Sequence, residues 1–118
     1  MQDTGMFIKE VDSPQLVSKM EENNDLVIID VREMHEINRG TIQGAIPMPM
    51  ASIPVRLNEI PKDKEVVFIC RSGARSGQVC MFLGQHGYEN VINLRGGMIG
   101  WVRSGNEPVL PDQVSNTY

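Results

Sequence analysis

The chain has 118 residues, a length typical of one domain with its own hydrophobic core. It is 41% hydrophobic and 22% charged, as in ordinary globular proteins, and its net charge of −4 gives no basic footprint for nucleic acid. The longest apolar runs, residues 26–29 and 66–69, are far too short to cross a membrane. Residues 1–13 have neither the basic nor the apolar region of a secretory signal, so we expect a cytoplasmic protein.

The first elements alternate between strand and helix. Residues 6–11 read as a short strand, and the segment "SPQLVSKMEENN" that follows has apolar residues at helical spacing. Ser13 is the expected N-cap of this helix, with Pro14 at the first helical position. Residues 25–31, "DLVIIDV", form a continuous apolar run of strand length, which predicts a strand buried on both faces.

A polar stretch leads to the middle of the chain, where two more elements are expected. Residues 45–50, "AIPMPM", read as a short strand that Pro49 ends. The segment "SIPVRLNEI", residues 52–60, suggests a helix that Pro61 stops.

The last elements continue the alternation. Residues 65–70, "EVVFIC", are a second fully buried strand, and a helix follows from about residue 74 with Gly87 at its C-terminal end. Residues 90–94 read as a last strand and residues 96–105 as a last short helix. This pattern predicts an α/β fold with a mostly parallel sheet of about five strands and helices on both faces. We expect one domain over residues 1–118, with a core at about 6–104 and a tail at 105–118.

Arginine is concentrated where strands end. Arg32, Arg71, Arg75 and Arg95 follow three of the predicted strands, whereas none of the four lysines does. Ligands of open parallel sheets bind beyond the carboxyl ends of the strands, so arginines gathered there favour a small anionic substrate. The alternative for Arg32 and Arg95 is that they pair with nearby Asp30, Glu33 or Glu36 and only brace loops.

Cys70 stands at the end of a buried strand, ahead of a loop and a helix N-terminus. Free backbone N–H groups and the helix dipole favour anions at such a place. Gly73 can take a left-handed conformation that lets these amides converge, and Arg71 and Arg75 add positive charge. All of these effects favour thiolate, so we expect a lowered pKa for Cys70 and a role as nucleophile rather than as buried filler.

The second cysteine has different surroundings. Cys80 lies about 9 Å along the predicted helix from its start, which is too far for a disulfide with Cys70. No polar cluster surrounds Cys80, so we expect a packing thiol. Two cysteines and two histidines, without a CxxC or HxxxH spacing, also disfavour a zinc site and dithiol chemistry.

Four segments together resemble the rhodanese domain, the sulfurtransferase module, across nearly the whole chain. They are "IIDVRE" (28–33), "GTIQGAI" (40–46), the cysteine loop "CRSGARS" (70–76) and "LRGGMIGW" (94–101). The second segment departs from the family's pattern, because Thr41 replaces a usual histidine. Thr41 is not the nucleophile, so we expect this change to affect loop packing more than activity.

The resemblance implies a rhodanese-like fold and transfer of sulfane sulfur through a persulfide on Cys70. Thiosulfate or a related anion would be the donor, and a thiol or cyanide the acceptor, with a partner protein in a sulfur relay as another acceptor. No cofactor, metal, nucleic acid or membrane is implied, and an ionised Cys70 needs no general base. The implied substrate-binding loop consists of Arg71, Ser72, Gly73, Ala74, Arg75 and Ser76, and the backbone amides of residues 71–75 would surround the outer sulfur.

Two other functions remain open at this point. Cysteine phosphatases and arsenate reductases also place a Cys–loop–Arg motif after a strand, but with five residues between Cys and Arg, whereas four separate Cys70 from Arg75. The other alternative is a rhodanese-fold module that docks a partner and catalyses nothing. Such modules usually lack the cysteine, which this chain retains.

Overall fold

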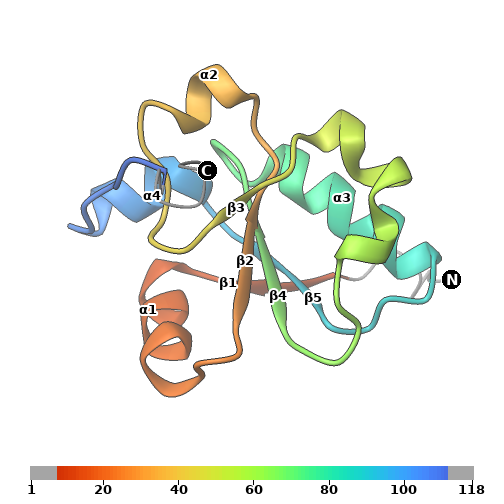
Figure 1. Cartoon of the computed structure of the whole chain (residues 1–118). Helices are drawn as coiled ribbons and strands as arrows, with labels where there is room; N and C mark the ends of the chain where they lie inside the picture. The colour runs from red at the N-terminus through yellow and green to blue at the C-terminus, as the bar shows by residue number, and fades with distance from the viewer. Residues whose placement is uncertain (1–7, 112–118) are drawn as a thin grey trace, which may run out of the picture.

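The computed structural model describes residues 8–111, in which five parallel strands form one sheet (Figure 1). The strands are β1 (Lys9–Val11), β2 (Val27–Asp30), β3 (Ile46–Pro47), β4 (Val66–Ile69) and β5 (Val91–Leu94). Their order across the sheet is β1-β5-β4-β2-β3, so β4 lies at the centre with β5 and β2 as its neighbours. The predicted α/β fold with a parallel sheet is confirmed.

Helical segments connect the strands and cover both faces of the sheet. They are the α-helices α1 (Ser13–Glu22), α2 (Met34–Ile37), α3 (Ala74–Gln85) and α4 (Gly97–Arg103), and the 3-10 helices η2 (Met50–Val55) and η3 (Leu57–Glu59). Helices α1 and α4 pack on one face, and α3 packs with η2 on the other (Figure 1). No helix within residues 8–111 is long and apolar enough to span a bilayer.

The central strand β4 builds a hydrophobic core on each face because its side chains alternate. Val66 and Phe68 point to the α3 face, where Cys70 continues their alternation. Val67 and Ile69 point to the face covered by α1 and α4. All of these residues are fully buried, which fixes the end of β4, and with it Cys70, between two packed layers.

The start of α1 differs from the sequence prediction. Asp12, not Ser13, is the N-cap: its side chain accepts a 2.9 Å hydrogen bond from the backbone N–H of Gln15. The Gln15 side chain in turn accepts from the N–H of Asp12 at 2.8 Å, which completes a capping box. Ser13 is therefore the first helical residue and is buried, and the prediction was wrong by one position.

The helix expected over residues 52–60 is instead the pair of 3-10 helices η2 and η3. Pro54 lies inside η2, where it supplies no backbone N–H and its ring would clash with an α-helical turn. The polar stretch that contains α2 gave no helix signal in the sequence. The strand expected from residue 6 begins at Lys9, and residues 6–7 lie outside the described part of the chain.

The C-terminal end of α3 is as predicted. Gly87 has a φ of +88°, the left-handed conformation that ends many helices. The N–H of Tyr88 then donates to the carbonyl oxygen of Leu83 at 3.0 Å, which returns the chain towards β5.

A buried polar cluster joins the end of β2 to the loop before β3. The Arg32 guanidinium donates to both carboxylate oxygens of Asp30, with its shortest bond at 2.7 Å, and to the carbonyl oxygen of Gly40 at 2.7 Å. The Thr41 hydroxyl donates to the same carboxylate at 2.7 Å, and Thr41 pairs through its backbone with Val109. Arg32 thus braces the loop, and Thr41 supplies a donor to the buried Asp30.

We expect Thr41→Val to lower the free energy of unfolding by about 1.5–3 kcal/mol, because a buried carboxylate loses one of its donors. Thr41→Ser keeps the hydroxyl and is the matched control. Urea denaturation followed by circular dichroism measures both variants. Equal stability of the valine and serine variants would show that the hydroxyl contributes nothing to the cluster.

Candidate active site

The thiol of Cys70 lies directly after β4, on the face of the sheet that α3 covers. The backbone N–H of Gly73 donates to the sulfur at 3.0 Å, and that of Ser76 donates at 3.4 Å. The Ser76 hydroxyl is a third partner, 3.3 Å from the sulfur. The loop and the first turn of α3 therefore direct two amides at one atom, beside the Ser76 hydroxyl, whose single hydrogen is shared with the Asn93 amide oxygen at 2.5 Å. Cys70 is fully buried among these groups.

The loop depends on Gly73, the N-cap of α3. Its φ is +101°, a conformation that residues with a side chain rarely adopt. A Cβ at this position would lie 3.2 Å from the carbonyl oxygen of Leu94 and 3.3 Å from the nitrogen of Gly96. The left-handed conformation expected here is confirmed, and the close approach of the β5–α4 turn is a second reason for glycine.

The turn between β5 and α4 holds the loop from its other side. The N–H of Met98 donates to the carbonyl oxygen of Cys70 at 2.9 Å, and the N–H of Ile99 donates to that of Arg71 at 3.0 Å. Gly97 lies so close that a Cβ would be 2.5 Å from both carbonyl oxygens. The paired glycines at 96 and 97 thus let α4 dock on the cysteine loop.

The pKa of Cys70 lies below its ordinary value. Burial is the largest single effect and raises the pKa, but hydrogen bonds from the Ser76 hydroxyl and from the amides of Ser76, Gly73 and Ser72 lower it by more in total. The lowered pKa predicted from the sequence therefore agrees with the geometry, and the hydrogen bonds of the loop are its main cause.

The Arg75 side chain pairs with an acidic partner. Its guanidinium makes a two-bond pair with the Glu36 carboxylate of α2, at 2.9 and 3.0 Å. This hydrogen-bonded pair lowers the pKa of Glu36 to about 2 and raises the pKa of Arg75. Glu36 lies 39 positions before Arg75, so the pair ties α2 to the first turn of α3.

The remaining strand-end arginines have separate places. Arg71 is exposed, and its side chain forms no ion pair or hydrogen bond with any residue from 8 to 111. Arg95 lies near Glu10 and Asp12, at 4.0 and 3.7 Å, and is 59% exposed. These partners differ from Asp30, Glu33 and Glu36, which the sequence suggested for Arg95. Of the two loop arginines, only Arg71 has no ion pair within residues 8–111.

Asn93 is a site residue that the sequence analysis missed. It is buried in β5, where its amide oxygen is 2.5 Å from the Ser76 hydroxyl. Its amide nitrogen donates to the carbonyl oxygen of Gly73 at 3.1 Å and to the Glu10 carboxylate at 2.9 Å. Asn93 thus fixes the two residues that contact the Cys70 sulfur, and its polarity within the apolar run "VINL" was the available signal.

Cys80 behaves as a packing residue. It is almost completely buried in the core under α3, and both cysteines are free thiols. Burial, with a smaller effect of the Glu10 charge, raises the pKa of Cys80 to about 12. The two thiols of the chain therefore have opposite electrostatic environments, as expected.

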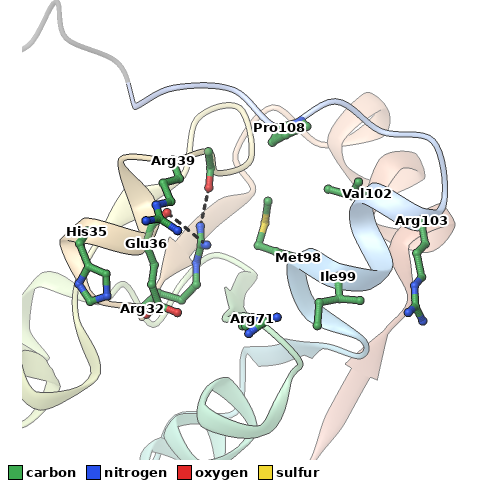
Figure 2. A pocket seen from close by; sticks show the side chains of 11 residues that line it. Arg32, His35, Glu36, Arg39, Arg71, Met98, Ile99, Val102, Arg103 and Pro108 are labelled. Atoms are coloured by element: carbon green, nitrogen blue, oxygen red, sulfur yellow. Dashed lines mark hydrogen bonds between the residues drawn. The ribbon is translucent and has the colours of Figure 1, made fainter.

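A pocket of about 640 Å³ lies beside the cysteine loop (Figure 2). Arg71 of the loop lines it, together with residues of the β2–β3 connection and of α4. No group of three or more histidine, cysteine or acidic side chains suited to a metal ion occurs in the part of the chain that the structure describes.

A family model described as the rhodanese-like domain matches residues 13–104. The chain belongs to the rhodanese-like family. The match covers four of the five strands, β2 to β5, and the helices α1 to α4, so the rhodanese-like assignment made from the four sequence motifs is confirmed.

Two relatives and one solved structure are similar to this chain over most of its length. A sulfurtransferase of Allochromatium vinosum is 47% identical over 106 residues, 90% of this chain and 99% of that protein. The thiosulfate sulfurtransferase GlpE of Glaesserella parasuis is 34% identical, over 78% of this chain and 85% of that protein. The solved structure of a rhodanese-like domain protein from Staphylococcus aureus superposes with a TM-score of 0.79 at 31% identity, over 89% of this chain and 100% of that one. These names support sulfur transfer as the class of chemistry.

We expect the alkylation rate of Cys70 against pH to show a midpoint below the value of about 8.5 for a free cysteine. Ser76→Ala removes one donor to the thiolate and should move the midpoint upward. Ser72→Ala is the matched control, because the Ser72 hydroxyl contacts the amide of Ala74 rather than the sulfur. Rates measured with iodoacetamide decide this, and an unchanged midpoint in Ser76→Ala would contradict the role given to the hydroxyl.

Proposed function

We propose that this rhodanese-like protein is a sulfurtransferase that moves sulfane sulfur from thiosulfate, or a related anion, to a thiol or cyanide through a persulfide on Cys70. The observation that carries the proposal is the convergence of two amides and one hydroxyl on a single sulfur at the end of the central strand. Such donors stabilise negative charge on sulfur, whether it is the thiolate or the persulfide that follows.

In the first half-reaction the Cys70 thiolate attacks the sulfane sulfur of thiosulfate. A new S–S bond forms, the S–S bond of the donor breaks, and sulfite leaves with the electron pair. In the second half-reaction cyanide attacks the outer sulfur, which leaves as thiocyanate and restores the thiolate. Charge balances in both steps, and neither needs a general base if Cys70 is ionised at the start.

The amides of residues 71–76 form the cradle proposed for the outer sulfur. Cys70 is fully buried in the structure, so a donor reaches it only when covering atoms move. Arg71, Ser72 and Ala74 are the exposed residues of the loop, and we expect the movement there.

We assign the two loop arginines different roles. Arg71, which is exposed and has no ionic partner within residues 8–111, orients the anionic donor. Arg75 positions the first turn of α3 through its pair with Glu36. An oxyanion would have to compete with that carboxylate for Arg75, which argues against the phosphatase alternative.

We expect the intact mass to rise by one sulfur atom on thiosulfate treatment and to return to the starting value with a thiol reductant. Cys70→Ser should abolish this gain and the transfer of sulfur to cyanide, because it removes the nucleophile. Cys80→Ser should keep most of the activity, because that thiol lies in the core. If both variants lost activity equally with the fold intact by circular dichroism, the assignment of the two thiols would be wrong.

Loop length gives a separate prediction. Four residues lie between Cys70 and Arg75, so the amides converge close to the sulfur, whereas phosphate needs donors spread around its oxygens at about 2.7–3.1 Å. The protein should therefore fail to hydrolyse aryl phosphates. Inserting one glycine between Gly73 and Ala74 should depress sulfur transfer by opening the cradle.

Phosphatase activity is measured with an aryl phosphate and the transfer reaction with thiosulfate and cyanide. The insertion variant is checked by circular dichroism, so that a loss of fold is recognised. Substantial phosphatase activity in the unmodified protein that disappears in Cys70→Ser would overturn the sulfurtransferase proposal.

A further inference from the structure

A buried chain of polar side chains runs from the Cys70 sulfur to β1. The Ser76 hydroxyl is 3.3 Å from the sulfur and 2.5 Å from the amide oxygen of Asn93. The amide nitrogen of Asn93 continues the chain to the Glu10 carboxylate at 2.9 Å. Ser76 is fully buried and Asn93 is only 2% exposed, so the middle of the chain is shielded from solvent. The direction of each hydrogen bond there follows from which atoms carry hydrogen.

The orientation of the Asn93 amide is fixed by two acceptors. Its nitrogen carries two hydrogens, which go to the Glu10 carboxylate and to the carbonyl oxygen of Gly73, at 2.9 and 3.1 Å. The reversed amide would place its oxygen against both of these oxygens, with no hydrogen in either contact. The amide oxygen of Asn93 therefore faces Ser76, where it can only accept.

The Ser76 hydroxyl has one hydrogen and two acceptors beside it. While Cys70 carries its proton, the hydroxyl donates to the amide oxygen at 2.5 Å, and the thiol can donate to the hydroxyl oxygen. An ionised sulfur is a stronger acceptor than an amide oxygen, so the hydrogen turns to it. The Asn93 oxygen then loses its donor, and no other donor within residues 8–111 reaches it. Asn93 and the sulfur thus compete for a single hydrogen.

We propose that Asn93 is a positioning residue that holds the Ser76 hydrogen while the Cys70 sulfur is neutral and releases it when that sulfur becomes charged. The proposal rests on the proposed function, because it concerns the charge on Cys70 during sulfur transfer. The thiolate receives the hydrogen. Once the outer sulfur is bound, the charge lies on that outer atom, the Cys70 sulfur is neutral, and the hydrogen returns to Asn93.

The second half-reaction reverses this movement. As an acceptor removes the outer sulfur, negative charge returns to the Cys70 sulfur, and the hydroxyl hydrogen follows it. No covalent bond of Ser76 or Asn93 changes, so both are restored at the end of each cycle. An unpaired buried polar group destabilises a protein, and Asn93 gives the hydroxyl an acceptor in the neutral states. Asn93 therefore favours the neutral sulfur and slightly opposes ionisation of Cys70.

The test is a double-mutant cycle read from the midpoint pH of Cys70 alkylation. Asn93→Leu replaces the competing acceptor by a side chain of similar size, and Ser76→Ala removes the hydrogen. Any effect of Asn93→Leu on the Gly73 carbonyl is present with and without the hydroxyl, so it cancels in the cycle. Ser72→Ala in both backgrounds is the matched control, because the Ser72 hydroxyl contacts the amide of Ala74.

Charged groups on the elements around Cys70 also influence its ionisation, and none of them is substituted. Glu10 loses the Asn93 nitrogen as a partner in Asn93→Leu, with and without the Ser76 hydroxyl, so this effect cancels as well. The charged groups are the Asp30–Arg32 pair at the end of β2, the Glu36–Arg75 pair between α2 and α3, Glu10 and Arg95 beside β5, Arg71 of the loop and Arg103 of α4.

We expect Ser76→Ala to raise the midpoint by about half a pH unit more in the Asn93→Leu background than in the unmodified protein, because no second acceptor then opposes donation to the sulfur. Ser72→Ala should shift the midpoint equally in both backgrounds. An equal shift for Ser76→Ala would show that Asn93 does not act through the hydroxyl. A smaller shift would show that Asn93 directs the hydrogen to the sulfur, and either result would overturn the proposal.

A second measurement needs no substitution at Asn93 and applies even if Asn93→Leu fails to fold. The chemical shift of the Asn93 side-chain carbonyl carbon, measured by NMR, depends on whether its oxygen accepts a hydrogen bond. Across the pH range in which Cys70 ionises, this shift should change more in the unmodified protein than in Ser76→Ala. Equal changes in the two proteins would contradict the proposal. Failure of thiosulfate to load Cys70 would instead count against the proposed function, and both titrations would still test Asn93.

Discussion

The site depends on one balance, between the burial of the Cys70 sulfur and the donors directed at it. Burial alone would raise the pKa of a thiol, as it does for Cys80 on the buried side of α3. At Cys70 the Ser76 hydroxyl and the loop amides outweigh burial, so the pKa falls. The amides are available because β4 ends at Ile69 and α3 begins at Ala74, which leaves the first N–H groups of the helix without partners inside it.

The loop keeps this arrangement because other elements occupy its carbonyl groups. Met98 and Ile99 donate to the carbonyls of Cys70 and Arg71, and Asn93 binds the carbonyl of Gly73. With its carbonyls bound on the far side, the loop presents its amides to the sulfur. Gly97 permits the close contact, since any side chain there would collide with two carbonyl oxygens. The geometry of the thiol is thus set by residues that never touch it.

The features that could be predicted from the sequence are those that depend on local patterns of residues. Apolar runs located the strands, Gly73 and Gly87 marked turns, and Cys70 was recognised from its neighbours in the chain. One local prediction was wrong, because the Asp12 carboxylate caps α1 in place of Ser13. The helix expected over residues 52–60 is present as two short 3-10 helices, with Pro54 inside the first. Asn93 and the partner of Arg75 were not predictable, since each acts through contacts between residues 17 to 83 positions apart in the chain.

The arginines show why the difference between local sequence patterns and long-range contacts matters for function. In the sequence, Arg32, Arg71, Arg75 and Arg95 were all candidates for binding an anion, with loop bracing as the alternative for Arg32 and Arg95. The fold gives these arginines different surroundings. Arg32 pairs with the buried carboxylate of Asp30, and Arg75 pairs with Glu36. Arg95 lies near Glu10 and Asp12. Arg71 alone of the four both lines the pocket and lacks an ionic partner within the described chain. In the proposed function, the Cys70 thiol carries the sulfur, and Arg71 is the one strand-end arginine left free to orient an anionic donor.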